Sequence, residues 1–125
     1  MNKPIVIPCR SYQNFITKML YFQGDPNLKC KEICFNQKTY LLLAHEIPDQ
    51  LDATFFSSQN HLSYPKLPVT CLNQNICYSF HIKELNQMLL PYEHIASIIL
   101  SLPYIFTKVA HHHDIYGNEL LILHN

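Results

Sequence analysis

The last thirty or so residues, from His94 to Asn125, constrain the fold more than any other part of the chain. Over residues 92–102, apolar side chains recur at helical spacing, and Pro103 ends the pattern. Two strand-like segments follow, separated by Gly117 and Asn118, a pair suited to a two-residue hairpin turn. The sequence therefore predicts a largely buried helix followed by a C-terminal β-hairpin.

The rest of the chain alternates between strand and helix patterns. Ser11 is a suitable helix N-cap. It is followed by an apolar stripe at positions i, i+3, i+4, i+7 and i+8, formed by Tyr12, Phe15, Ile16, Met19 and Leu20. Strands are predicted at residues 4–8, 31–35, 39–45 and 76–82, and a further helix at residues 83–90.

These elements predict the α+β fold class, with one domain over residues 1–125. We expect a mostly antiparallel sheet packed against two or three helices, with the hairpin at the C-terminus. Residues 48–75 show weak periodicity and several prolines, so they predict an irregular loop. Loops of that length are uncommon in compact domains and indicate either a functional segment or disorder.

The low and balanced charge of the chain limits which classes of partner it is expected to bind. Only 14% of residues are charged, and the formal net charge is zero. Because no basic run offers a footprint for phosphates, we expect no nucleic acid partner. No apolar run reaches the roughly 20 residues of a membrane-spanning helix, so we expect no membrane partner either. A net charge near zero gives little repulsion between copies and favours a homodimer or binding to another protein.

The cysteines indicate a reducing compartment. There are five, an odd number without a Cys-x-x-Cys pair, which argues against a zinc finger and a closed disulfide framework. The N-terminus lacks the long apolar core of a secretory signal. We therefore expect a cytoplasmic protein, with delivery by a specialised secretion route left open. Two interpretations are open for the remaining cysteines, Cys30, Cys34, Cys71 and Cys77. They are either small core residues or, together with His45 or His81, ligands of a metal ion.

A metal site is one hypothesis for the C-terminal hairpin. With Gly117 and Asn118 as the turn, His111 lies opposite His124, and His113 lies on the same side. Three imidazoles with an open fourth position could hold zinc or another divalent metal, which would activate water for hydrolysis. No other cofactor is predicted. A slip of one residue would exchange the two faces of the ribbon.

A thiol nucleophile is the second hypothesis. Cys9 lies just before the first predicted helix, where a thiol pKa can be lowered. In the predicted register His112 and Asn125 share the other face of the hairpin. This Cys-His-Asn order resembles the layout of papain-like hydrolases, although the preceding glutamine and the glycine-rich surroundings of that family are missing. A cysteine packed under the helix is the competing interpretation.

Protein binding is the third hypothesis and the one that the sequence favours. The segment around Phe55, Phe56, His61 and Tyr64 is aromatic and poor in charge, as protein interfaces are. The sequence therefore predicts a small regulatory, adaptor or inhibitor protein that binds another protein without catalytic activity. The alternative is a small hydrolase, either papain-like through Cys9, His112 and Asn125 or metal-dependent through His111, His113 and His124.

Overall fold

The computed structural model describes residues 4–47, 76–87 and 91–125. The first of these segments contains β1 (Ile5–Pro8), α1 (Tyr12–Met19), a short 3-10 helix η1 (Leu20–Phe22), β2 (Lys29–Phe35) and β3 (Lys38–Ala44). The remainder contains β4 (Tyr78–His81), α3 (Ile82–Asn86), α4 (Pro91–Ser101), β5 (Lys108–His113) and β6 (Glu119–His124). The predicted irregular loop over residues 48–75 lies outside the described residues.

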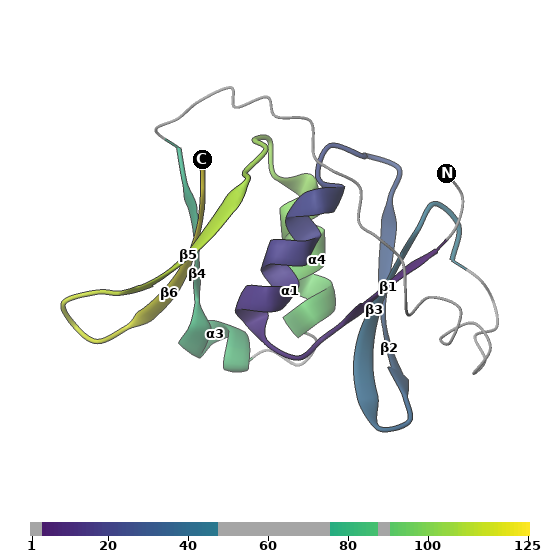
Figure 1. Ribbon diagram of the computed structural model, residues 1–125, viewed down its shortest axis with the longest axis horizontal. Helices are drawn as coiled ribbons and strands as arrows, with labels where there is room; N and C mark the ends of the chain where they lie inside the picture. Colours follow the sequence, from purple (N-terminus) through teal and green to yellow (C-terminus); the bar gives the residue numbers. More distant parts are fainter. Residues whose placement is uncertain (1–3, 48–75, 88–90) are drawn as a thin grey trace.

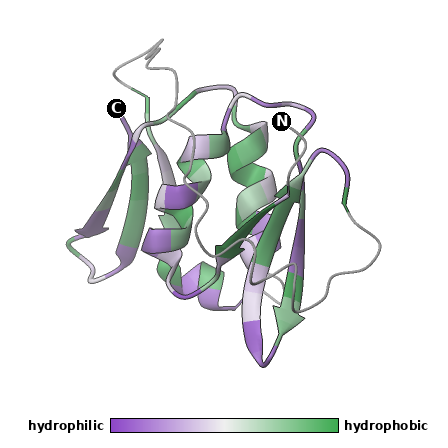
Figure 2. Ribbon diagram, turned by 45° about the vertical axis from the view of Figure 1, so that its right-hand side comes forward, coloured by the Kyte–Doolittle hydropathy of each residue, from purple (hydrophilic) through white to green (hydrophobic). Residues whose placement is uncertain are grey.

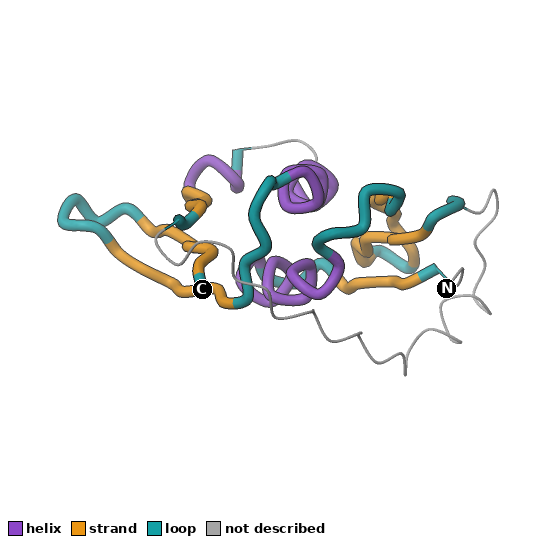
Figure 3. Tube along the Cα trace, turned by 90° about the horizontal axis from the view of Figure 1, so that it is seen from above, coloured by secondary structure: helices purple, strands orange, loops and turns teal. Residues whose placement is uncertain are grey.

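The described strands form two antiparallel sheets of three strands each, in the orders β1-β3-β2 and β4-β6-β5. Helices α1 and α4 lie side by side between the two sheets (Figure 1). The view from above also places them between the two groups of strands (Figure 3). The predicted α+β class, the antiparallel pairing and the C-terminal hairpin are confirmed, but the strands divide into two sheets where a single sheet was expected.

Helix α1 forms where the apolar stripe predicts it. The Ser11 hydroxyl accepts a hydrogen bond from the backbone N–H of Asn14 at 3.3 Å, which satisfies one of the unpaired donors of the first turn. The stripe is buried at Phe15, Ile16 and Met19. The helix tightens into η1 and stops before Gly24, whose φ of +86° is a conformation that favours glycine.

The first sheet is built around β3, as its apolar run predicts. Leu41 to Ala44 are all buried, and β3 pairs with β1 on one side and β2 on the other. The turn between β2 and β3 consists of Asn36 and Gln37, both with positive φ, as a type I′ turn requires. Strand β1 ends at Pro8 and lies at the sheet edge, where a proline removes no ladder hydrogen bond.

One hydrophobic core connects both sheets through the helices. Ile7 and Leu41 enter it from the first sheet, Phe15 and Ile99 from α1 and α4, and Leu121 from the second sheet. Polar residues gather toward the ends of the β2–β3 and β5–β6 hairpins, where the strands extend away from this core (Figure 2).

The predicted strand over residues 76–82 is shorter in the structure. Strand β4 covers only Tyr78–His81, and Ile82 begins α3. Ile82 was expected to continue the apolar face of the strand. Because the chain turns into a helix at this residue, its side chain no longer follows the alternation of the strand.

Candidate functional site on the C-terminal hairpin

The loop of the β5–β6 hairpin has three residues, Ile115, Tyr116 and Gly117, and a backbone hydrogen bond between Asp114 and Asn118 closes it. The Asp114 N–H donates to the Asn118 carbonyl at 3.0 Å, and the Gly117 N–H donates to the Asp114 carbonyl at 3.1 Å. Gly117 adopts a φ of +82°. This is the three-residue hairpin in which a tight turn is followed by a glycine in the left-handed region.

The Asp114 side chain fixes this loop. Its Oδ1 accepts the backbone N–H groups of Tyr116 and Asn118, both at 2.9 Å, and its Oδ2 accepts from Asn118 Nδ2 at 3.0 Å. These hydrogen bonds from Asn118 and Tyr116 lower the pKa of the Asp114 carboxyl below its ordinary value. The loop is therefore held by an ionised carboxylate at neutral pH.

The longer loop makes the predicted register wrong. A turn at Gly117 and Asn118 would place Tyr116 opposite Glu119, whereas His113 is the residue opposite Glu119. This is a shift of three residues, an odd number, so it changes which side chains share a face. His111, His113 and Glu119 lie on one face, and His124, which pairs with Lys108, lies on the other. The structure thus does not bring His124 to the predicted histidine set.

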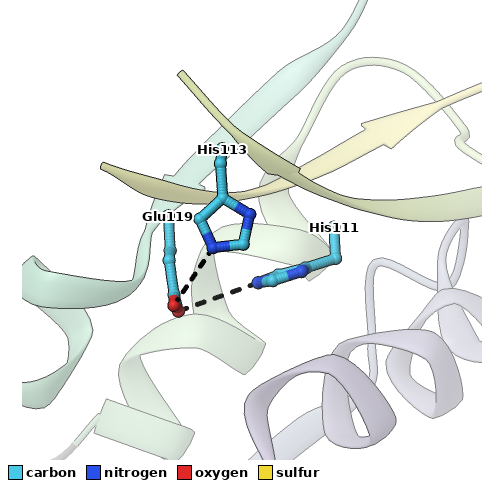
Figure 4. Close-up of side chains that lie close together, drawn as sticks. All are labelled: His111, His113 and Glu119. Carbon is cyan, nitrogen blue, oxygen red and sulfur yellow. Dashed lines mark hydrogen bonds and ion pairs between the residues drawn. The ribbon is translucent and has the colours of Figure 1, made fainter. Parts of the chain in front are cut away.

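Glu119 takes the place predicted for His124. Its Oε1 lies 3.3 Å from His113 Nε2, and its Oε2 lies 3.7 Å from His111 Nε2 (Figure 4). The two imidazole rings are 4.9 Å apart between centroids and nearly perpendicular, at 85°. We call His111, His113 and Glu119 the His-His-Glu cluster.

The His-His-Glu cluster lies on the face of the second sheet that packs on the helices. On this face Phe80, Leu121 and Leu123 are buried. The side-chain exposure is 37% at His111 and 57% at His113. The same face therefore passes from core to solvent toward the loop, and the cluster occupies the part that extends beyond the core.

Next to the cluster is an open depression. The hairpin contributes Gly117, Asn118 and Glu119 to its lining. The segment around α3 contributes His81, Ile82, Lys83, Glu84 and Asn86. Glu119 therefore belongs both to the His-His-Glu cluster and to the lining of this depression.

The hairpin loop carries two exposed apolar side chains. Ile115 is 91% exposed and Tyr116 is 83% exposed, far above the 40% of Tyr21 and the 38% of Tyr104. The loop projects from the body of the fold at the far end of the hairpin (Figure 1). Neither residue was singled out from the sequence, because the expected two-residue turn made them part of a strand.

The three residues of the predicted Cys-His-Asn set are not brought together. Cys9 follows β1 of the first sheet, and its thiol contacts the Ile7 carbonyl at 3.8 Å. His112 lies on β5, in the other sheet beyond the helices (Figure 1). Burial, with the nearby Glu32 charge, raises the pKa of the Cys9 thiol to about 12, the opposite of the lowered value that a nucleophile needs.

Asn125 is engaged in the fold. Its Oδ1 accepts the Thr107 backbone N–H and hydroxyl, each at 3.1 Å, and its Nδ2 donates to the Ile105 carbonyl at 3.2 Å. This amide ties the end of β6 to the segment that leads into β5. Its hydrogen bonds account for its orientation without a histidine partner.

The binding segment predicted around Phe55, Phe56, His61 and Tyr64 lies outside the described residues. The part of the chain that the structure describes has no helix long and apolar enough to cross a membrane. No family model, curated protein or solved structure matches the chain.

Proposed function

We propose that the chain is a protein-binding module that inserts the β5–β6 loop into an apolar cleft of another protein. The observation that carries the proposal is the exposure of Ile115 and Tyr116, at 91% and 83%. Two adjacent large apolar residues at a projecting loop leave hydrophobic surface in water that a partner would cover. This proposal specifies where a regulatory, adaptor or inhibitor protein of this sequence would make contact.

Burial of these side chains offers substantial binding free energy. Moving an isoleucine-sized side chain from water into an apolar site contributes about 1.5–3 kcal/mol. Tyrosine adds a large contact area with a polar hydroxyl at its end, a reason why it is enriched among the residues that dominate interfaces. Ile115 and Tyr116 together therefore form a compact anchor.

The loop is also preorganised. The Asp114 carboxylate holds the backbone N–H groups of Tyr116 and Asn118 at 2.9 Å, which restricts the loop before any partner arrives. A loop that is already ordered loses less conformational entropy on binding. The backbone N–H groups of Tyr116, Gly117 and Asn118 are paired within the loop, so burying it in an apolar cleft leaves fewer donors unsatisfied.

A photo-crosslinking amino acid at position 116 provides the first test. In an extract of the source cells, we expect it to capture a defined partner that the same crosslinker at Tyr104 does not capture. The partner is then purified and its affinity measured by calorimetry. We expect Ile115→Ser with Tyr116→Ser to weaken binding by about thirtyfold or more, and Tyr104→Ser to change it less than about twofold.

Two results would overturn the proposal. One is a purified partner that binds the Ile115→Ser, Tyr116→Ser protein as tightly as the unchanged protein. The other is crosslinking at position 116 only between copies of this chain, with a dimer in light scattering that the double substitution dissociates. In that case the loop is a homodimer contact.

A further inference from the structure

We propose that His111, His113 and Glu119 bind a divalent transition metal ion, with zinc as the representative of the class. The three ligand atoms lie within 4.8 Å of one another. Figure 4 shows both imidazoles directed toward the Glu119 carboxylate. The proposal is independent of partner binding by the loop, because it rests on a different face and different residues of the hairpin.

The spacing of the ligand atoms is close to what a metal requires. Zinc binds imidazole nitrogen and carboxylate oxygen at about 2.0–2.2 Å, so two ligands of a tetrahedral site lie roughly 3.3 Å apart. The His113 to Glu119 distance is 3.3 Å, and the His111 to Glu119 distance is 3.7 Å. All three side chains are partly exposed, so they can rotate by the remaining amount without disturbing the core.

The backbone arrangement favours three-point binding. His111 and His113 are two residues apart on β5 and point to the same face, and Glu119 is directly opposite His113 on β6. The loop between them is fixed by Asp114. The three attachment points are therefore set before a metal binds, which reduces the entropic cost of assembling the ligands.

The donor set selects the class of metal. Imidazole nitrogen suits zinc, copper, nickel and iron, whereas magnesium and calcium prefer sites made only of oxygen ligands. Three protein ligands leave at least one coordination position for water or a further donor, and the depression beside Glu119 provides space for it. The site thus has the composition of an open transition-metal site.

An ion pair between protonated histidine and Glu119 is the competing explanation of the cluster. A metal binds neutral imidazoles, whereas the ion pair needs a protonated one, so saturable Zn²⁺ binding that depends on these three residues is expected only for a metal site. Adventitious binding to the run of three histidines is a further alternative, and it would use His112 as much as its neighbours.

The site is tested by titrating Zn²⁺ into the untagged protein at pH 7.5 and measuring the heat of binding by calorimetry. We expect one ion per chain. Glu119→Gln and His111→Ala should each weaken Zn²⁺ binding by at least about tenfold. A loss of about this size is found even when only a residue that hydrogen-bonds to a metal ligand is replaced. His112→Ala and His124→Ala are the matched controls, since both residues lie on the opposite face, and we expect less than about a twofold change.

Imidazole NMR of the unchanged protein gives a second readout that needs no substitution. Zn²⁺ should shift the ring signals of His111 and His113 with one saturation curve and leave those of His112 and His124 in place. The proposal is overturned by the absence of saturable binding, by equal effects of His112→Ala and His111→Ala, or by ring shifts spread over all of these histidines.

Discussion

The side-chain amide of Gln23 pairs with the backbone of Phe106 as a neighbouring strand would. Gln23 Nε2 donates to the Phe106 carbonyl at 2.7 Å, and Gln23 Oε1 accepts the Phe106 N–H at 3.2 Å. Nε2 also donates to the Leu20 carbonyl at 3.1 Å. Through these hydrogen bonds the buried amide connects the end of the first helix to the segment that leads into β5 and the His-His-Glu cluster.

Replacing Gln23 with leucine should destabilise the fold. Leucine keeps much of the volume but leaves the buried N–H and carbonyl of Phe106 without partners, which costs about 1–3 kcal/mol for each unsatisfied group. We expect the free energy of unfolding in urea to fall by about 2–3 kcal/mol. Gln13→Leu, on the exposed face of α1, should change it by less than about 0.5 kcal/mol. Equal effects would show that the Gln23 pairing contributes nothing specific.

Replacing Asp114 with alanine should loosen the hairpin loop. The amides of Tyr116 and Asn118 lose their carboxylate acceptor, so we expect both to exchange hydrogen with solvent faster, while core amides such as that of Leu121 keep their protection. Unchanged exchange at Tyr116 would mean that Gly117 and the backbone pairing fix the loop without the side chain.

Acid should release the loop in the unchanged protein. The pKa of Asp114 is lowered in the fold, so its contribution to stability is fully present above the ordinary value of 3.8 and is lost as pH falls through the lowered value. The amide shifts of Tyr116 and Asn118 should therefore titrate together with a midpoint below 3.8. A midpoint at or above that value would contradict the assignment of these hydrogen bonds to an ionised carboxylate.

Alkylation should spare Cys9. With its pKa raised to about 12, the thiolate fraction at pH 8 is about 1 in 10,000, against about 1 in 10 for a thiol at the ordinary value of 9.0. We expect iodoacetamide to modify Cys9 at least about a hundredfold more slowly than the exposed Cys34. Peptide mass spectrometry measures the two rates of modification. A Cys9 that reacts as fast as Cys34 would contradict the raised pKa of the buried thiol.

Local patterns were sufficient to predict most helices and strands. The Ser11 cap and the apolar stripe that follows it predict α1, because a helix buried on one face has apolar residues at helical spacing. The continuous apolar run of β3 predicts a strand covered on both sides. The division into two sheets could not be predicted in the same way. It depends on which strands pair with one another on each side of the helices, and tertiary packing decides that pairing.

The site shows how one loop residue decides a register. The histidines at positions 111 and 113 were predicted to share a face, and they do. The third member predicted for this set was wrong because Asp114 precedes a three-residue loop with Gly117 in its last position, a pattern that competes with the two-residue turn at Gly117 and Asn118. An aspartate three residues before a glycine was the signal that would have indicated Glu119.

The Glu32 carboxylate on β2 should be a source of instability at neutral pH. It accepts the backbone N–H groups of Tyr92 and Glu93 at the start of α4, yet its Oε1 is buried with no hydrogen-bond partner among the described residues. Burial and the nearby Glu93 charge raise the pKa of Glu32, so the two hydrogen bonds do not fully offset the loss of hydration.

Replacing Glu32 with glutamine should therefore stabilise the protein, and more so as pH rises. A carboxyl whose pKa is raised in the fold binds more protons folded than unfolded, so the unchanged protein loses stability as pH rises from the ordinary value of 4.5 through the raised value. Glutamine removes this loss and can still accept the two N–H groups. We expect Tm at pH 7 to rise by about 2 °C, with no gain at pH 4, and Glu46→Gln on the surface to show neither effect. A Glu32→Gln protein that melts earlier at pH 7 would mean that the charged hydrogen bonds to α4 outweigh the burial of the carboxylate.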